Sequence, residues 1–154
     1  MLTVIASVAA SAQTWDVTKT AKVNTIAGTP FMIVPPATTV SVGLSSVHTA
    51  KAKNTSGSTQ SANISISLRL TASPGNLLFD SKFVSMNTAW ADGDSYFING
   101  VFPAGHAGGQ LTSNLSGTKD VGLGTYTAHA VTSVRIDMVL YEKDDNTQTF
   151  EVKN

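Results

Sequence analysis

The residues of this chain that could do chemistry are few and lie far apart. Its three histidines, His48, His106 and His129, fall in different expected elements and have no metal-ligand spacing. His106 lies in the stretch "PAGHAGG", a loop where a histidine could touch a ligand. His129 falls on the polar face of an expected strand, which predicts a cross-strand partner or an interface residue.

Two aspartates form the one pattern that is typical of a metal site. The stretch Asp92-Gly93-Asp94-Ser95 resembles half of a calcium loop, because oxygen ligands at positions i and i+2 can reach one Ca²⁺. The complete loop needs a glutamate at its twelfth position, which is Pro103 here. A plain Asp-Gly turn is the alternative. Asp92 and Asp94 are therefore candidate calcium ligands, and no other cofactor is expected.

Hydrolytic catalysis has no recognisable motif in this chain. There is no G-x-S-x-G elbow and no glycine-rich phosphate loop between a strand and a helix. The absence of cysteine excludes disulfides, thiolate zinc sites and cysteine nucleophiles. The ten carboxylates could include a glycosidase pair, but nothing in the sequence selects two of them. We expect a non-enzymatic protein with no catalytic residues.

The two tryptophans are candidates for contact with a partner or a ligand. Trp90 stands beside the Asp-Gly turn in "NTAWADGDSY", where it could be an exposed stacking or interface anchor or could pack at the edge of the core. Together with Trp15 and His106 it completes the set of candidate interface or ligand contacts.

The composition indicates one domain with an unusually uncharged surface. The chain has 154 residues, of which 42% are hydrophobic and 13% are charged, with a formal net charge of zero. No segment concentrates lysine or arginine, so we expect no binding to nucleic acid. No apolar run is long enough to span a membrane. Hydroxyl-rich surfaces lose little on desolvation, which suits contacts between copies but is also ordinary for an all-β domain.

Alternation with a period of two dominates the chain and predicts strands. Ala62 to Leu70 is the clearest case, with apolar and polar residues on opposite faces. A second long strand is expected near 123–142, followed by a turn at Asp144-Asp145-Asn146 and a closing strand at Thr147–Val152. Residues 103–122 are expected to form a loop with at most one short strand. The pattern predicts an all-β fold, an antiparallel β-sandwich of immunoglobulin-like or jelly-roll type.

Three stretches resemble a bacterial or phage immunoglobulin-like module. These are "AKAKNTSGSTQSANISISLRL", "VFPAG" and "GLGTYTAHAVTSV", and the resemblance covers roughly residues 38–142. It implies an immunoglobulin-like β-sandwich with a binding or structural role, and it implies no particular ligand.

Residues 1–14, "MLTVIASVAASAQT", are expected to form an N-terminal arm before a single domain at 15–154. A signal peptide would need a charged n-region, and the segment has none. A short helix would suit the alanines, but β-branched residues favour a strand. An apolar strand in water invites association, so Leu2, Val4, Ile5 and Val8 are candidate subunit-interface residues.

These observations favour a non-enzymatic structural subunit of a large assembly. We expect a phage virion component, either a capsid decoration or a minor coat protein, whose partners are copies of itself and other structural proteins. One alternative is an extracellular, pilus-like filament subunit that polymerises by strand donation. A second alternative is a carbohydrate- or surface-binding module that uses Trp90, His106 and the 92–110 loops.

Overall fold

The computed structural model describes residues 14–28, 30–100 and 111–154. Every regular element in this part of the chain is a strand, as the alternation predicts. The elements are β1 (Trp15–Ala27), β2 (Phe31–Met32), β3 (Val40–Asn54), β4 (Gln60–Ser73), β5 (Leu77–Trp90), β6 (Ser95–Phe97), β7 (Thr112–Val121), β8 (Gly124–Ile136) and β9 (Val139–Lys153). The all-β fold class is therefore confirmed.

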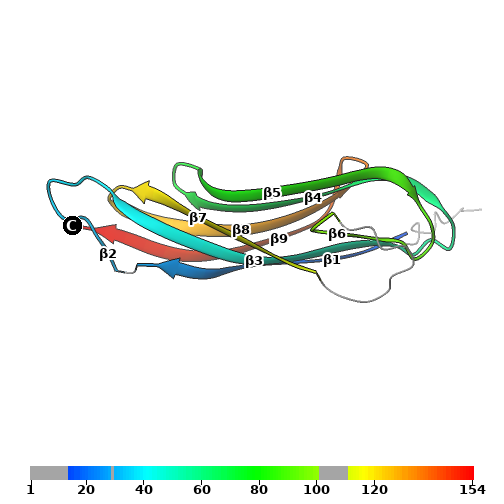
Figure 1. The fold of residues 1–154 in the computed structure, drawn as a ribbon, viewed down its shortest axis with the longest axis horizontal. Coiled ribbons are helices and arrows are strands. Elements are labelled where there is room, and N and C mark those ends of the chain that lie inside the picture. The colour runs from blue at the N-terminus through cyan, green and yellow to red at the C-terminus, as the bar shows by residue number, and fades with distance from the viewer. Residues whose placement is uncertain (1–13, 29, 101–110) are drawn as a thin grey trace, which may run out of the picture.

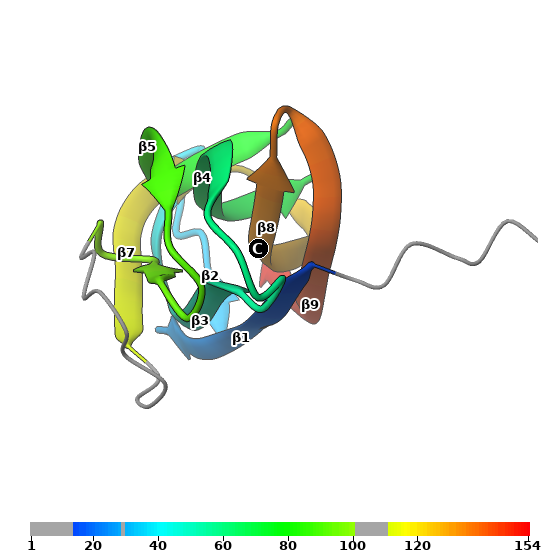
Figure 2. The ribbon, with the colours of Figure 1, turned by 90° about the vertical axis from the view of Figure 1, so that its right-hand side faces the viewer.

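The strands form two sheets that curl around a common core (Figures 1 and 2). In the first sheet β3 pairs with β1 on one side and with β6 and β7 in succession on the other. The second sheet has the order β2-β9-β8-β4-β5. All pairings are antiparallel except that of β2 with β9. The molecule is elongated because its long strands run along one axis.

Alternating side chains from the two sheets build the core. In β4 the residues from Ala62 to Ala72 alternate between buried and partly exposed, as the sequence pattern predicts. Ile64, Ile66 and Leu68 are fully buried, and burial of such a side chain contributes about 1.5–3 kcal/mol. The opposite face of β4 carries asparagine, serines, arginine and threonine, so the outer surface of this sheet is polar.

The two lateral seams between the sheets differ in how they close. At the first seam, side chains of β9 reach the backbone of β1: Asp144 Oδ2 accepts from the Ala21 N–H at 2.8 Å, and Asn146 Oδ1 accepts from the Val23 N–H at 2.9 Å. At the second seam, Asp80 of β5 accepts from the Ser116 N–H of β7 at 3.0 Å. Within the described residues, this is the hydrogen bond that joins β5 and β7 across the second seam.

The predicted strand at 123–142 is wrong in its length. The chain turns at Asp137 and Met138, whose φ angles are 51° and 67°, and β9 then runs back along β8. Asp144 and Asp145 accordingly lie inside β9 instead of at a turn. Two successive residues with positive φ give the twist that joins adjacent strands tightly, which the side-chain alternation alone does not reveal.

The expectation of a loop at 103–122 is also corrected in part. Strand β7 occupies Thr112–Val121 and pairs with β3 through ten consecutive positions. Its serines, threonines and glycine are typical of loops, which is why the sequence predicts a loop here. The hydrogen bonds to β3 nevertheless hold this segment as a strand.

Candidate functional site

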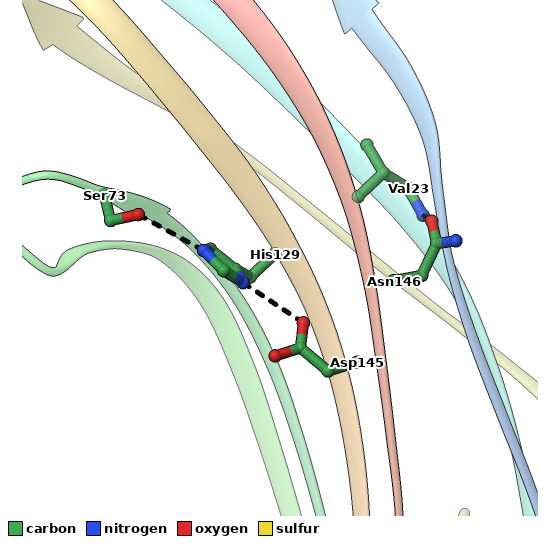
Figure 3. Close-up of polar contacts among 5 residues, drawn as sticks. All are labelled: Val23, Ser73, His129, Asp145 and Asn146. Atoms are coloured by element: carbon green, nitrogen blue, oxygen red, sulfur yellow. Dashed lines mark hydrogen bonds and ion pairs between the residues drawn. The ribbon is translucent and has the colours of Figure 1, made fainter.

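His129 stands in the middle of a row of three polar side chains that crosses three strands. It projects from β8 to the outer face of the sheet, between Ser73 of β4 and Asp145 of β9 (Figure 3). Its Nδ1 lies 3.1 Å from Oδ1 of Asp145, and its Nε2 lies 3.2 Å from Oγ of Ser73. A carboxylate only accepts, so Nδ1 carries a proton, and in the neutral ring Nε2 accepts from the Ser73 hydroxyl. The prediction of a cross-strand partner for His129 is confirmed.

Strand alternation separates Asp145 from its neighbour Asn146. Figure 3 shows Asp145 directed to His129 on the outer face, whereas Asn146 is directed the other way, to the backbone of Val23. One strand thus positions the polar row and closes the seam with β1 through adjacent residues.

The row borders a concavity of about 450 Å³ on the outer face of this sheet. Besides Ser73 and His129, its lining consists of Arg69, Thr71, Asn76, Val131 and Lys143. The volume lies within the range of small-molecule sites, which is roughly 300–1,000 Å³. The lining combines two cationic side chains with hydroxyl, amide and imidazole groups around one apolar residue.

The order Ser–His–Asp is also that of a base-activated nucleophile, but acyl transfer needs donors for the oxyanion as well. In one common arrangement the backbone N–H of the residue after the serine supplies such a donor. Here that residue is Pro74, which has no N–H. That arrangement of the oxyanion donor is therefore not available at Ser73.

A second concavity, of about 420 Å³, lies over β1, β3 and β7. It is lined by small, hydroxyl and aliphatic residues without any titratable side chain. This surface is concave, but its lining has no charged side chain that could bind an ion or a charged ligand.

His48 lies inside the molecule and serves a different purpose from His129. It is fully buried, its Nε2 lies 2.7 Å from Oγ of Ser46, and its Nδ1 lies 2.8 Å from Oγ1 of Thr132. The Thr132 hydroxyl donates to the Thr20 carbonyl at 2.8 Å, so it accepts from Nδ1–H of His48. Burial lowers the pKa of His48 from 6.5 to about 4, which keeps the ring neutral.

Both tryptophans belong to the core, which corrects their candidate role as exposed contacts. Trp90 is 0% exposed and its Nε1–H donates to the Ala62 carbonyl at 2.9 Å. Trp15 is 6% exposed and meets Trp90 edge to face, with ring centroids 6.4 Å apart. Tyr96 also packs against Trp90, with ring centroids 5.4 Å apart. Both indoles are therefore too deeply buried to contact a partner.

The carboxylates of Asp92 and Asp94 bind backbone amides at the end of the sandwich. Asp92 Oδ1 accepts from the Gly57 N–H at 2.9 Å, and Asp94 Oδ2 accepts from the Ala91 N–H at 2.7 Å. Within residues 14–28, 30–100 and 111–154, no three acidic or histidine side chains gather where they could hold a metal ion. These contacts account for both aspartates as turn residues, and calcium binding stays an untested prediction.

The other predicted site residues lie outside the described part of the chain. These are the arm residues Leu2, Val4, Ile5 and Val8, together with His106. In the described part, no helix is long and apolar enough to cross a membrane.

The row at His129 was not predicted because Asp145 was assigned to a turn. Once the turn stands at Asp137 and Met138, alternation along β8 and β9 brings His129 and Asp145 to the same face. Ser73 and Arg69 reach this face through the alternation of β4, which the sequence does show. The pairing of β4 with β8 is the step that a single sequence leaves open.

Comparison with models of protein families gives no match for this chain, and comparison with curated proteins gives none either. Among solved structures, the chain aligns with the alkylpurine DNA glycosylase AlkC of Pseudomonas fluorescens bound to DNA containing an abasic site analog. The alignment has 12% sequence identity and a TM-score of 0.25, and it covers 87% of this chain and 30% of that one. A likeness at this level carries no argument about fold or function.

Proposed function

We propose that this protein is a non-enzymatic structural subunit of a large assembly, and specifically a phage virion protein such as a capsid decoration or minor coat protein. The observation that carries the proposal is the outer edge of β5. This strand has fourteen residues, and it pairs with β4 on one side only.

The free part of this edge is long and regular. From Ser81 to Ala89 the strand pairs residue by residue with β4, without a bulge and without a proline. Within the described residues, the Ser81 N–H donates to Asp80 Oδ1 of the same strand at 2.8 Å, and the backbone of the rest of this stretch bonds to β4 alone. An unpaired edge of this kind is a template for a strand from another chain.

At the opposite edge of the sandwich, where β1 meets β9, side-chain contacts protect the strands. Within the part of the chain that the structure describes, the edge at β5 lacks such protection from Ser81 to Ala89. Side chains of Asp144 and Asn146 accept hydrogen bonds from backbone N–H groups of β1. Lys19 also forms an ion pair with Glu142 across the same seam, at 2.9 Å. Such side-chain contacts block strand addition there. Of these two edges, β5 is therefore the one open to strand pairing.

The arm at residues 1–14 is the segment that we propose for this edge in a neighbouring copy. It contains no charged side chain, and four of its first eight residues are Leu2, Val4, Ile5 and Val8. Thr14, its last residue, is held at the end of the sandwich, where its carbonyl accepts from the Thr55 N–H at 2.9 Å. Strand exchange of this kind links subunits through backbone hydrogen bonds.

The test measures the mass of the particle by sedimentation for three proteins. The full chain should assemble, whereas deletion of residues 1–12 and the double variant Phe83→Lys, Ser85→Lys on β5 should give monomers. The free stretch has one lysine, Lys82, and two more near the edge would oppose strand addition. The double variant Thr147→Lys, Thr149→Lys, which adds the same two charges to exposed positions of β9, is the control and should assemble.

Two results would overturn the proposal. One is a full chain that remains a stable monomer of 16.0 kDa. The other is normal assembly after the arm is deleted. Circular dichroism of each variant verifies that the sandwich is folded.

The free edge also favours the second candidate, an extracellular filament subunit that polymerises by strand donation. Electron micrographs of the native assembly distinguish the two, since one predicts a DNA-filled capsid and the other a fibre. The binding-module alternative loses Trp90 as its anchor, because this indole is buried.

A further inference from the structure

The concavity beside His129 carries a net positive charge. Arg69 and Lys143 both line it, and neither side chain takes part in an ion pair or a hydrogen bond within the described residues. Asp145, the carboxylate of the row, keeps its negative charge when it accepts from the neutral ring of His129. Two cations against one engaged carboxylate leave the concavity attractive to an anion.

The neutral groups of the lining are those that bind hydroxyls. Ser73, Thr71 and Asn76 can each donate and accept hydrogen bonds, and the ring of His129 is held in place by Asp145. Val131 adds an apolar surface between them. Such a mixture suits a ligand with many hydroxyls and an apolar C–H face, which is the chemistry of a sugar ring.

We propose that this concavity binds a saccharide that carries a carboxylate group, of the uronic or sialic acid class. Arg69 pairs with the carboxylate, because its planar guanidinium matches the two oxygens, and Lys143 adds a second positive charge. Ser73, Thr71 and Asn76 bind the ring hydroxyls, and His129 holds the Ser73 hydroxyl in place. The inference goes beyond the proposed assembly and does not depend on it, since each copy holds its own site.

Assembly would strengthen such binding. Many weak sites on one particle act together when the ligand is a polymer or a cell surface, so a modest affinity per site suffices. A polyhydroxylated acidic polymer is therefore the natural ligand of an array of these subunits.

The experiment is saturation-transfer difference NMR, which works for a monomer and for a particle. The probes are galacturonic acid oligomers and sialyllactose, with galactose oligomers and lactose as their neutral counterparts. We expect transfer to at least one acidic probe, with an affinity about tenfold above that of its neutral counterpart. Arg69→Gln should lower that affinity by about tenfold, and Lys143→Gln should also lower it.

Arg135→Gln is the matched control. Arg135 is exposed on β8, on the same face of the sheet, but it does not line the concavity. Its loss removes the same charge from the protein and should leave binding unchanged.

Three outcomes of the binding comparison would overturn the proposal. They are the absence of transfer to every acidic probe, equal affinity for acidic and neutral probes, and equal losses in Arg69→Gln and Arg135→Gln. Displacement of the sugar by an equal concentration of inorganic phosphate would show a site for simple anions only, which also contradicts it. None of these outcomes depends on whether the arm-deleted protein assembles.

Discussion

Gly117 of β7 leaves no room for a larger side chain. A Cβ atom at this position would stand 2.1 Å from the Phe79 carbonyl oxygen of β5, which is well inside van der Waals contact. The obstacle is backbone, so it cannot rotate away as the tip of a side chain can. The absence of a side chain at one residue thus permits the close approach of the two sheets at this seam.

Gly117→Ala should destabilise the fold by about 1–3 kcal/mol, because the seam must open to admit the methyl group. Gly43→Ala is the matched control within a strand of the same sheet. Its Cβ would meet Ala27 and Thr118 at 3.6 and 3.8 Å, which are ordinary contacts. It should be neutral or stabilising by up to about 1 kcal/mol. Urea unfolding of both variants measures the difference, and equal stabilities would contradict the described seam.

The sequence predicts the position of a side chain, buried or exposed, where its residue type and the strand alternation agree. The buried face of β4 follows from its alternation, and so does the outward position of His129. Trp90 was ambiguous, because an indole beside a turn suits both the core and an interface, and the partner of its N–H, the Ala62 carbonyl, lies far away in sequence. Only the tertiary structure shows that Trp90 belongs to the core.

The β8–β9 hairpin is the element where local chemistry is least favourable. Its turn places Asp137 and Met138 at positive φ, and only the first of them is a residue type that tolerates this conformation well. Asp137 is held there by the Asn63 N–H, which donates to its Oδ1 at 2.9 Å. Met138 is 81% exposed and gains no burial in return.

Met138→Gly should therefore stabilise the protein by about 0.5–1 kcal/mol, since glycine adopts positive φ without a steric penalty. Met138→Val should destabilise it, because a β-branched residue fits this region worst. Thermal unfolding of the two variants ranks them against the parent chain. If valine proved as stable as glycine, the two-residue turn at this position would be wrong.

The same turn explains why the sequence predicts one long strand at 123–142 where the structure has two paired strands. Ala128 to Leu140 keeps an apolar residue at nearly every second position, so alternation continues through Asp137 and Met138 as if no turn existed. The stronger turn signal, Asp144-Asp145-Asn146, is used for side-chain contacts inside β9 instead. Strand existence was thus predictable from alternation, whereas strand ends and pairings were not.

At the scale of the whole molecule, His48 joins the two sheets through the core. Its partners Ser46 and Thr132 lie on β3 and β8, in different sheets, and Thr132 continues the chain of hydrogen bonds to the backbone of β1. All three side chains are buried and each polar atom has a partner. Such a network is stable only while the imidazole is neutral, because a buried charge without a carboxylate partner is costly.

Stability should consequently fall as the solution becomes acidic. The pKa of His48 is about 4 in the folded protein and 6.5 as the ordinary value, so the unfolded chain binds the proton more readily between these limits. The contribution of neutral His48 is complete above pH 6.5 and is lost as the pH falls to 4, with a total on the order of 3 kcal/mol.

His48→Gln removes the titrating ring while it keeps a donor and an acceptor for Thr132 and Ser46. We expect the unfolding free energy of the parent chain to decrease by up to about 3 kcal/mol more than that of the variant between pH 7 and pH 4. The other titratable groups are common to both proteins, so they cancel in this difference. Urea unfolding at a series of pH values measures it. Parallel curves over this range would mean that His48 titrates as it does in the unfolded chain, and that it is not the neutral link between the sheets.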